Sequence, residues 1–194
     1  MAIKDDQQFE FQIIAGDLKG RIIRTPNLGT TRPPLSRLRK AIFDFLWPHI
    51  SDQSYLDLFS GTGSYLFEAV SRGANRAVGV ELDPRLADCI NRQAKDLRVS
   101  ESLTCLTADV FEAVPKFSLK GEKFDVVMIA PPQYKGLIDK TLQFMHASPV
   151  VLSGGLIVCQ HDTSELKSLQ FPHFPIEQQR KYGNTTFTIL KMVL

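Results

Sequence analysis

Short hydrophobic runs in the middle of the chain alternate with segments in which hydrophobic residues recur at helical spacing. Short apolar runs between turn signals are typical of buried strands, and recurrence every three or four residues is typical of amphipathic helices. We predict strands at 54–59, 76–81, 102–107 and 124–129, and helices at 64–71, at 84–97, in a short segment after Asp109 and at 137–146. This alternation predicts an α/β fold, a doubly wound parallel sheet with helices on both faces.

The N-terminal part of the chain departs from this alternation. Two β-prone runs, at 9–14 and 21–25, are separated by Gly16 and Gly20, which predicts a β-hairpin. Ser36 is suited to cap a helix that carries apolar residues at helical spacing and stops before Pro48. We therefore expect an N-terminal extension at 1–34 and a main domain at 35–194.

The C-terminal part departs as well. An apolar run at 156–159 follows two glycines, and two further runs at 176–182 and 185–193 flank the pair Gly183 and Asn184. A Gly-Asn pair between two such runs predicts an antiparallel hairpin. A parallel sheet that ends in an antiparallel hairpin differs from the usual dinucleotide-binding arrangement.

Charge is unevenly distributed along a chain whose formal net charge is only +2. Between positions 19 and 40 there are seven basic residues and no acidic one. They are Lys19, Arg21, Arg24, Arg32, Arg37, Arg39 and Lys40. Such a block attracts phosphate backbones, because each neutralised phosphate releases counterions. The alternative is a solvated positive surface without a partner.

The remaining composition excludes several classes of protein. The three cysteines are odd in number and widely spaced, and no cysteine or histidine has metal-ligand spacing, so neither disulfides nor a metal site are expected. No apolar stretch reaches the roughly 20 residues of a membrane helix, and no signal peptide is recognisable. We expect a monomeric cytoplasmic protein that does not contact a membrane.

A glycine-rich turn is the first candidate for a ligand site. The segment 55–64 is an apolar strand that ends in Gly61 and Gly63 and opens into a helix, which brings backbone and helix N-terminus close to a ligand. Asp57 lies inside the end of that strand, where an ionised carboxylate is costly without a donor. An ammonium group of a ligand, bound directly or through water, would be such a donor.

Two more acidic residues follow successive strands. Glu81 closes the next strand at the place where an acid binds ribose hydroxyls in nucleotide-binding βαβ units. Asp109 follows the strand after that, and it either accepts a hydrogen bond from an adenine amino group or caps a helix. S-adenosylmethionine suits three acids better than a dinucleotide does, because it is positively charged and has no phosphate. The predicted cofactor contacts are Asp57, Ser60, Gly61, Thr62, Gly63, Glu81, Asp109 and Val110.

The sequence resembles the bacterial 16S ribosomal RNA guanine-N2 methyltransferases of the RsmD type, some of which are also described as DNA methylases. The matching motifs lie at 13–16 (IIAG), 19–21 (KGR), 31–33 (TRP), 37–43 (RLRKAIF), 57–63 (DLFSGTG), 68–69 (EA) and 71–74 (SRGA). The resemblance implies the seven-stranded, Rossmann-like class I methyltransferase sheet, with an antiparallel last strand. It also implies a small ribosomal subunit or its RNA as partner, with the basic segment binding the RNA phosphates. Thr31, Arg32 or Pro33 could equally contact the cofactor instead.

The sequence departs from this family in the substrate loop. Family members have Asn or Asp, two prolines and an aromatic residue after the fourth strand, and here the loop reads Ala130, Pro131, Pro132, Gln133 and Tyr134. In the family pattern the first residue accepts hydrogen bonds from the exocyclic amine and the aromatic stacks on a flipped base. Ala130 has no such acceptor, and Tyr134 comes one place late.

The leading hypothesis is methyl transfer to an exocyclic amine of an RNA base, with guanine N2 of 16S ribosomal RNA as the expected target. One alternative is an RNA-binding protein that binds the cofactor without turnover, motivated by Ala130 and Gln133. A second is a DNA adenine-N6 methyltransferase, and a third is a small-molecule methyltransferase, which leaves the basic block unexplained.

Overall fold

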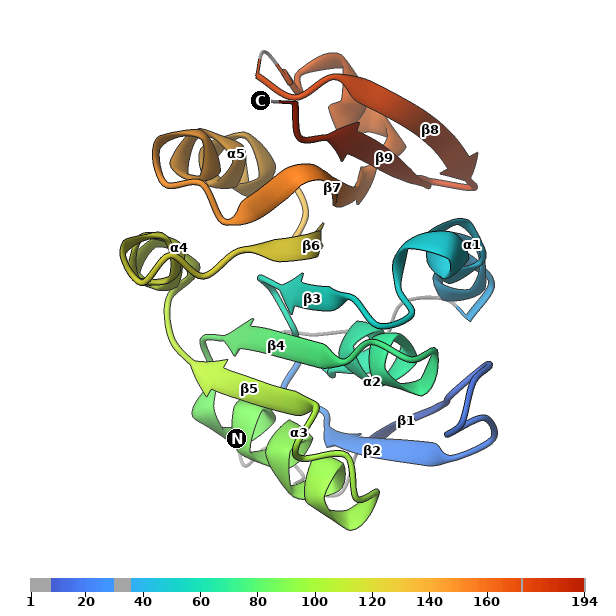
Figure 1. The fold of residues 1–194 in the computed structure, drawn as a ribbon. Helices are drawn as coiled ribbons and strands as arrows, with labels where there is room; N and C mark the ends of the chain where they lie inside the picture. Colours follow the sequence, from blue (N-terminus) through green and yellow to red (C-terminus); the bar gives the residue numbers. More distant parts are fainter. Residues whose placement is uncertain (1–7, 30–35, 172, 194) are drawn as a thin grey trace, which may run out of the picture.

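The computed structural model describes residues 8–29, 36–171 and 173–193. In this part of the chain one seven-stranded sheet has the order β5-β4-β3-β6-β7-β9-β8 (Figure 1). Its strands are β3 (Ser54–Asp57), β4 (Arg76–Glu81), β5 (Leu103–Thr107), β6 (Phe124–Ile129), β7 (Val151–Asp162), β8 (Ile176–Tyr182) and β9 (Thr185–Lys191). Strands β3 to β7 are parallel, and β9 lies antiparallel between β7 and β8. The predicted α/β fold with an antiparallel last strand is confirmed.

Helices cover both faces of this sheet (Figure 1). They are α1 (Ser36–Leu46), α2 (Ser64–Ser71), α3 (Pro84–Asp96), α4 (Val110–Leu119) and α5 (Leu137–Ala147). Because successive side chains of a strand point to opposite faces, each strand contributes side chains to two hydrophobic cores, one on each face of the sheet. In β6, Met128 packs in the core with α1, α2 and α3, whereas Val127 and Ile129 pack in the core with α4 and α5.

The predicted N-terminal hairpin is present as a separate two-stranded sheet. Strands β1 (Gln8–Gln12) and β2 (Ile22–Pro26) pair antiparallel, and Ile13 and Ile23 are buried in the same core as α1 and α2. The turn between the strands lies against the end of α2, where the Asp17 amide donates to the Ser71 carbonyl at 2.7 Å. The hairpin is therefore anchored to the helix that follows the glycine turn.

Several elements differ from the sequence-based expectation, β3, α4 and β7 among them. Strand β3 ends at Asp57, two residues early, because the backbone already turns toward Gly61. Helix α4 is ten residues long rather than short, and Pro115 lies inside it. Gly154 and Gly155 lie within β7 instead of preceding it, at a register shift opposite β6. There a side chain at position 155 would come within 2.8 Å of the Asp125 carbonyl oxygen, so glycine permits the close approach.

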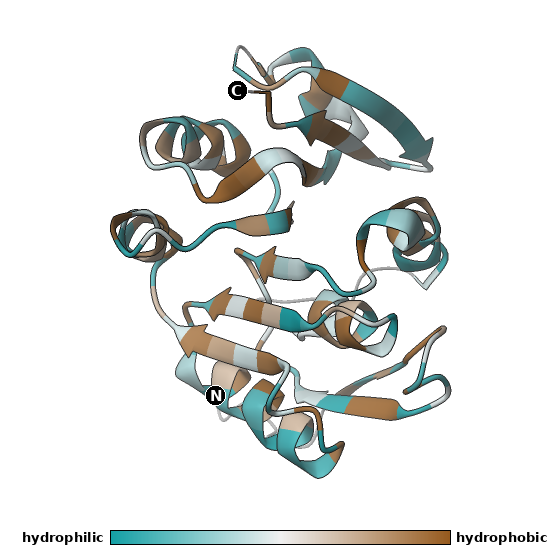
Figure 2. Ribbon diagram, in the orientation of Figure 1, coloured by the Kyte–Doolittle hydropathy of each residue, from teal (hydrophilic) through white to brown (hydrophobic). Residues whose placement is uncertain are grey.

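Hydropathy separates the inner strands from one edge of the sheet. Figure 2 shows hydrophobic residues on the central strands, whereas β8 is largely hydrophilic. Most of β8 is exposed, and its sequence IEQQRKY carries charged and amide side chains. Such residues on an edge strand discourage pairing with another chain. Among the described residues, no helix combines the length and the apolar character needed to cross a membrane.

Candidate functional site

The glycine turn between β3 and α2 forms the centre of the site. Gly61 has φ +51° and Gly63 has φ +75°, a left-handed conformation that favours glycine. A side chain at position 63 would also come within 2.7 Å of the Ile90 Cγ1 atom. Helix α2 begins directly after Gly63, and no side chain caps its N-terminus. Its backbone amides therefore face the carboxyl edge of the sheet, where ligands bind in this class of fold.

Asp57 is the buried acid of this site. Its Oδ1 atom accepts a hydrogen bond from the Phe59 amide at 3.3 Å, while its buried Oδ2 atom has no hydrogen-bond partner among the residues that the structure describes. Burial raises the pKa of Asp57 to about 7, and the nearby charge of Glu81 adds to the rise, while the Phe59 amide opposes it. A buried acceptor without a donor is unfavourable, so the carboxylate is suited to bind a cationic group of a ligand. The ammonium of S-adenosylmethionine fits this position.

Glu81, the second acid of the site, connects the end of β4 to the glycine turn. Its Oε2 atom accepts from the Gly61 amide at 2.7 Å and its Oε1 atom accepts from the Asp83 amide at 2.9 Å. Each carboxylate oxygen has two lone pairs, so both can still accept from ribose hydroxyls. The pairing of β3 with β4 brings Asp57 and Glu81 to the same edge, as the sequence predicted.

Ser60 and Thr62 have buried side chains in the turn. The Ser60 hydroxyl donates to the Asp57 carbonyl at 3.1 Å and so closes the turn on itself. Its backbone amide donates to the Val80 carbonyl at 3.1 Å, and its carbonyl accepts from the Gly63 amide at 2.7 Å. The predicted cofactor role of both residues remains a prediction.

Asp109 shows one of the two roles that the sequence left open. Its Oδ1 atom accepts from the Phe111 amide at 2.7 Å, so it caps the N-terminus of α4. Asp109 is nevertheless exposed after β5, on the same edge as Asp57 and Glu81, and Val110 is buried in the core beneath α4. The adenine contact of Asp109 and Val110 remains a prediction.

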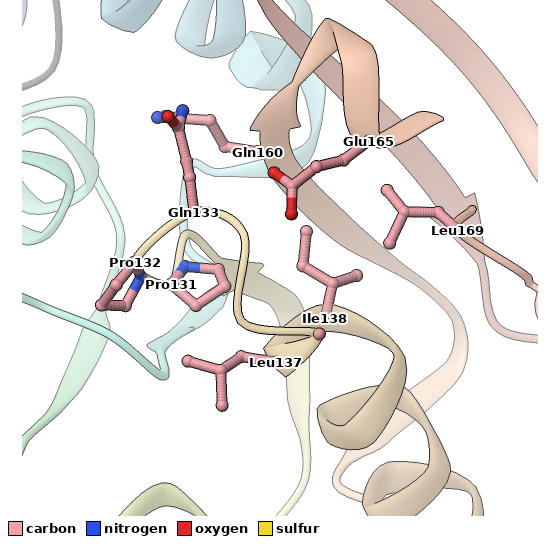
Figure 3. Close-up of a pocket in the computed structure, with 9 residues that line it drawn as sticks. Pro131, Pro132, Gln133, Leu137, Ile138, Gln160, Glu165 and Leu169 are labelled. Atoms are coloured by element: carbon pink, nitrogen blue, oxygen red, sulfur yellow. The ribbon is translucent and has the colours of Figure 1, made fainter. Parts of the chain in front are cut away.

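The loop after β6 forms the second half of the site. Pro131, Pro132 and Gln133 line a small pocket together with Gln160 of β7 and Glu165 (Figure 3). Ala130 at the start of the loop is half-buried against the core. The pocket lies at the carboxyl ends of β6 and β7, and β3 with its glycine turn follows on the other side of β6.

Tyr134 is held by the segment that follows β7. Its backbone has φ +61°, and its amide donates to the Glu165 Oε1 atom at 2.9 Å. A hydrogen bond from the Tyr134 hydroxyl to the Asp162 carboxylate raises the pKa of Tyr134. Tyr134 is 66% exposed, so an aromatic surface remains available on the loop although it comes one place late in the sequence.

The structure overturns one predicted RNA contact. Arg39 is 1% exposed and forms an ion pair with the fully buried Glu68, with 3.1 Å between Nε and Oε1. It also donates to the Gln12 carbonyl at 2.6 Å. The Arg39 side chain is thus buried and paired inside the core, and it cannot reach an RNA phosphate. Arg32, a further predicted contact, lies outside the described residues.

The other basic residues are exposed but do not form one patch. Lys19 and Arg21 belong to the hairpin turn, which contacts Ser71 at the end of α2 opposite the glycine turn. Arg24 pairs with Glu10, and Lys40 pairs with Asp44.

Helices α1 and α2 run in the same direction, since Arg39 pairs with Glu68 and Asp44 lies near Arg72. Arg37 therefore lies toward the end at which α2 and the glycine turn begin.

Among the pocket residues that the sequence did not point to, two have polar side chains, Gln160 and Glu165. Gln160 follows the apolar run of β7, and a polar residue at the carboxyl end of a buried strand was the available signal. Glu165 forms a capping box with Asp162 in the 3₁₀ helix η2 (Thr163–Lys167), which the sequence analysis did not consider. No group of three or more histidine, cysteine or acidic residues that could hold a metal occurs among the residues that the structure describes.

Known proteins share this arrangement. A family model described as Conserved hypothetical protein 95 matches residues 11–191. Ribosomal RNA small subunit methyltransferase D of Haemophilus influenzae is 31% identical over 140 residues, covering 70% of each chain. A Thermus thermophilus structure described as a hypothetical protein has a TM-score of 0.77 and 30% identity, covering 95% of this chain and 99% of that one. An RNA methyltransferase from Salinibacter ruber in complex with S-adenosyl-L-homocysteine has a TM-score of 0.65 and 18% identity, covering 84% and 94%.

The strand order, the antiparallel β9 and the acid-lined glycine turn are those of the class I methyltransferase fold, whose members use S-adenosylmethionine. The chain belongs to the family described as Conserved hypothetical protein 95, the family of the RsmD-type methyltransferases. The resemblance seen in the sequence is thereby confirmed.

Proposed function

We propose that this protein methylates an exocyclic amine of an RNA base, and that the target is guanine N2 in 16S ribosomal RNA. The observation that carries the proposal is the buried Asp57 Oδ2 atom on β3, which has no partner within the described part of the chain and lies next to the strand from which the proline loop and its pocket extend. The relative in Haemophilus influenzae is a small-subunit ribosomal RNA methyltransferase by name. A ribosomal substrate would place the protein in the cytoplasm with the small subunit as its partner.

The cofactor is held by the residues of the glycine turn and the two acids. Asp57 binds the ammonium group, Glu81 accepts from the ribose hydroxyls, and the amides at the start of α2 lie against the cofactor. S-adenosylmethionine supplies an electrophilic methyl group there when bound. The protein's main contribution is to hold the acceptor amine in line with that methyl group, since orientation alone accounts for a large share of such barriers.

The substrate base is held by the proline loop. Pro131 is buried and fixes the loop against β6, while the exposed ring of Tyr134 offers a stacking surface for a base turned out of its helix. Exposed Arg37 lies on the same side as the glycine turn, where it would bind a phosphate near the target nucleotide. Lys19 and Arg21 would bind RNA farther away, beyond the other end of α2.

The test is transfer of labelled methyl from S-adenosylmethionine to small ribosomal subunits, bare 16S RNA, large subunits and duplex DNA. We expect label in a small-subunit substrate only, on a guanine, and no transfer by Asp57→Ala. Cofactor binding without transfer to any substrate would contradict the proposal and favour a silent RNA-binding protein. Label on DNA adenine would contradict it in favour of a DNA methyltransferase.

A further inference from the structure

Gln160 of β7 lies beside Ala130 at the edge of the sheet. Strands β6 and β7 pair in parallel with Met128 opposite Val158 and Ile129 opposite Cys159, so the next step places residue 130 beside residue 160. Side chains alternate along a strand, and Met128 and Val158 both face the core of α1 to α3. Ala130 packs against that same core. Its methyl side chain leaves room at this edge for the longer side chain of Gln160.

The Gln160 amide is fixed by a tyrosine of the cofactor helix. The Tyr65 hydroxyl donates a hydrogen bond to the Gln160 Oε1 atom. Tyr65 is the second residue of α2, two positions after Gly63, and it is only 5% exposed. Burial raises the pKa of Tyr65, so its hydroxyl stays neutral and keeps its proton for this bond. Gln160 is thereby held in a fixed position relative to the glycine turn.

Gln160 differs from the other polar side chains that line the pocket (Figure 3). Glu165 accepts two backbone amides, those of Tyr134 and Asp162, and is thereby tied to the loop and to the segment that follows β7. Gln133 is exposed on the loop. Gln160 alone among these three pocket residues is tied to the helix that follows the glycine turn. It is therefore the polar group best placed to control where an acceptor amine lies relative to a methyl donor.

We propose that Gln160, oriented by Tyr65, binds the base whose amine is methylated and provides the hydrogen-bond acceptor that residue 130 does not provide. An amide oxygen has two lone pairs, so Oε1 can accept from Tyr65 and from an exocyclic amine together. The Nε2 group can donate to a ring nitrogen beside that amine. This inference rests on the proposed function, since it names the group that recognises the acceptor base.

The test uses substitutions that separate base binding from cofactor binding. We expect Gln160→Ala to lower kcat/KM for the RNA by roughly tenfold to a hundredfold, as expected for loss of a hydrogen bond made in the active site. Cofactor affinity measured by calorimetry should change less than about twofold, because the Asp57 and Glu81 contacts are untouched. Tyr65→Phe keeps the ring and removes only the hydroxyl, so we expect a smaller loss with the same unchanged cofactor affinity. Gln170→Ala is the matched control, because Gln170 is exposed and does not line the pocket.

A second-site variant tests the spatial relation directly. Ala130→Asn combined with Gln160→Ala should recover most of the lost activity, because it returns an amide to the same edge from β6. In the wild-type background Ala130→Asn should bring no gain, since Gln160 already fills the role. If Gln160→Ala and Tyr65→Phe transfer methyl at the wild-type rate, the inference is wrong while the proposed function stands. If the wild-type protein methylates no nucleic acid, the proposed function fails and this inference fails with it.

Discussion

At the scale of single residues, Asp57 is the group whose protonation we expect to control the site. The carboxyl is fully buried, one of its oxygens has no partner among the described residues, and its pKa is raised to about 7. In the proposed function its carboxylate would stabilise a bound ammonium group, and it would have to lose its proton first. We therefore expect the residue that the sequence marked as unfavourable inside a strand to couple cofactor binding to protonation.

We predict that cofactor affinity depends on the protonation of Asp57. Below pH 7 the free carboxyl is protonated, so cofactor binding must release a proton. The dissociation constant should therefore rise by up to about tenfold for each unit by which the pH falls. Above about pH 8 the affinity should level off. Calorimetric titration of S-adenosyl-L-homocysteine between pH 5.5 and 8.5 measures this profile, with Asp57→Asn as control, which should bind weakly at every pH. A wild-type profile that is flat across pH 7 would contradict the assignment.

We predict that Gly63→Ala harms both stability and cofactor binding. The substitution places a side chain on a left-handed backbone and within 2.7 Å of the buried Ile90. Together these should lower the free energy of unfolding by about 2 to 4 kcal/mol. Gly121→Ala is the control, because Gly121 has φ +70° but open space around it, so only the backbone cost of about 1 kcal/mol applies. Urea unfolding of the two variants compares them. Equal losses would mean that the contact with Ile90 is relieved without cost.

At the scale of elements, a buried ion cluster holds the hairpin, α1 and α2 together. Glu68 accepts from the Ile14 amide at 2.8 Å, from Arg39 at 3.1 Å and from Arg72 at 3.3 Å. The sequence predicted these elements but assigned Arg39 to RNA, because charge alone was considered. Arg39 precedes Ile42 by three positions and Phe43 by four, so helical spacing already placed it on the buried face.

We predict that Glu68→Ala costs about 3 to 5 kcal/mol of unfolding free energy, because it leaves two buried guanidinium groups and a backbone amide without their acceptor. Lys116→Ala removes an exposed ion pair with Glu112 on α4 and should cost less than about 1 kcal/mol. Chemical denaturation of both variants measures the difference. A small effect of Glu68→Ala would show that the cluster does not anchor the hairpin.

Helix α1 also carries Arg37, whose contact with RNA remains a prediction. We predict that Arg37→Ala weakens RNA binding and reduces the slope of log affinity against log salt by about 0.7 to 1, the value of one phosphate contact. Lys116→Ala, on the opposite face of the sheet, should leave the slope unchanged. Filter binding over a range of salt concentrations measures both. An unchanged slope for Arg37→Ala would remove α1 from the RNA-binding surface.

At the scale of the whole molecule, local signals predicted the elements, whereas the site depends on how the strands are ordered. Periodicity and turn residues placed β4, β6 and α2 correctly, and the alternation of elements gave a parallel sheet. Local sequence patterns do not show which distant strands pair. They therefore could not predict that β9 lies between β7 and β8 or that β6 pairs with β7. For this reason Asp57 and Glu81 were predictable, while the approach of Gln160 to Ala130 was not.

We propose that this protein methylates one guanine of 16S ribosomal RNA at N2. Mass spectrometry of nucleosides and fragments tests this on the small-subunit RNA of cells that lack the protein, and of the same cells that carry it again. We predict that a single N2-methylguanosine is absent without the protein, returns with the wild-type chain and stays absent with Asp57→Ala. An unchanged set of methylated nucleotides in the two cell lines would contradict it.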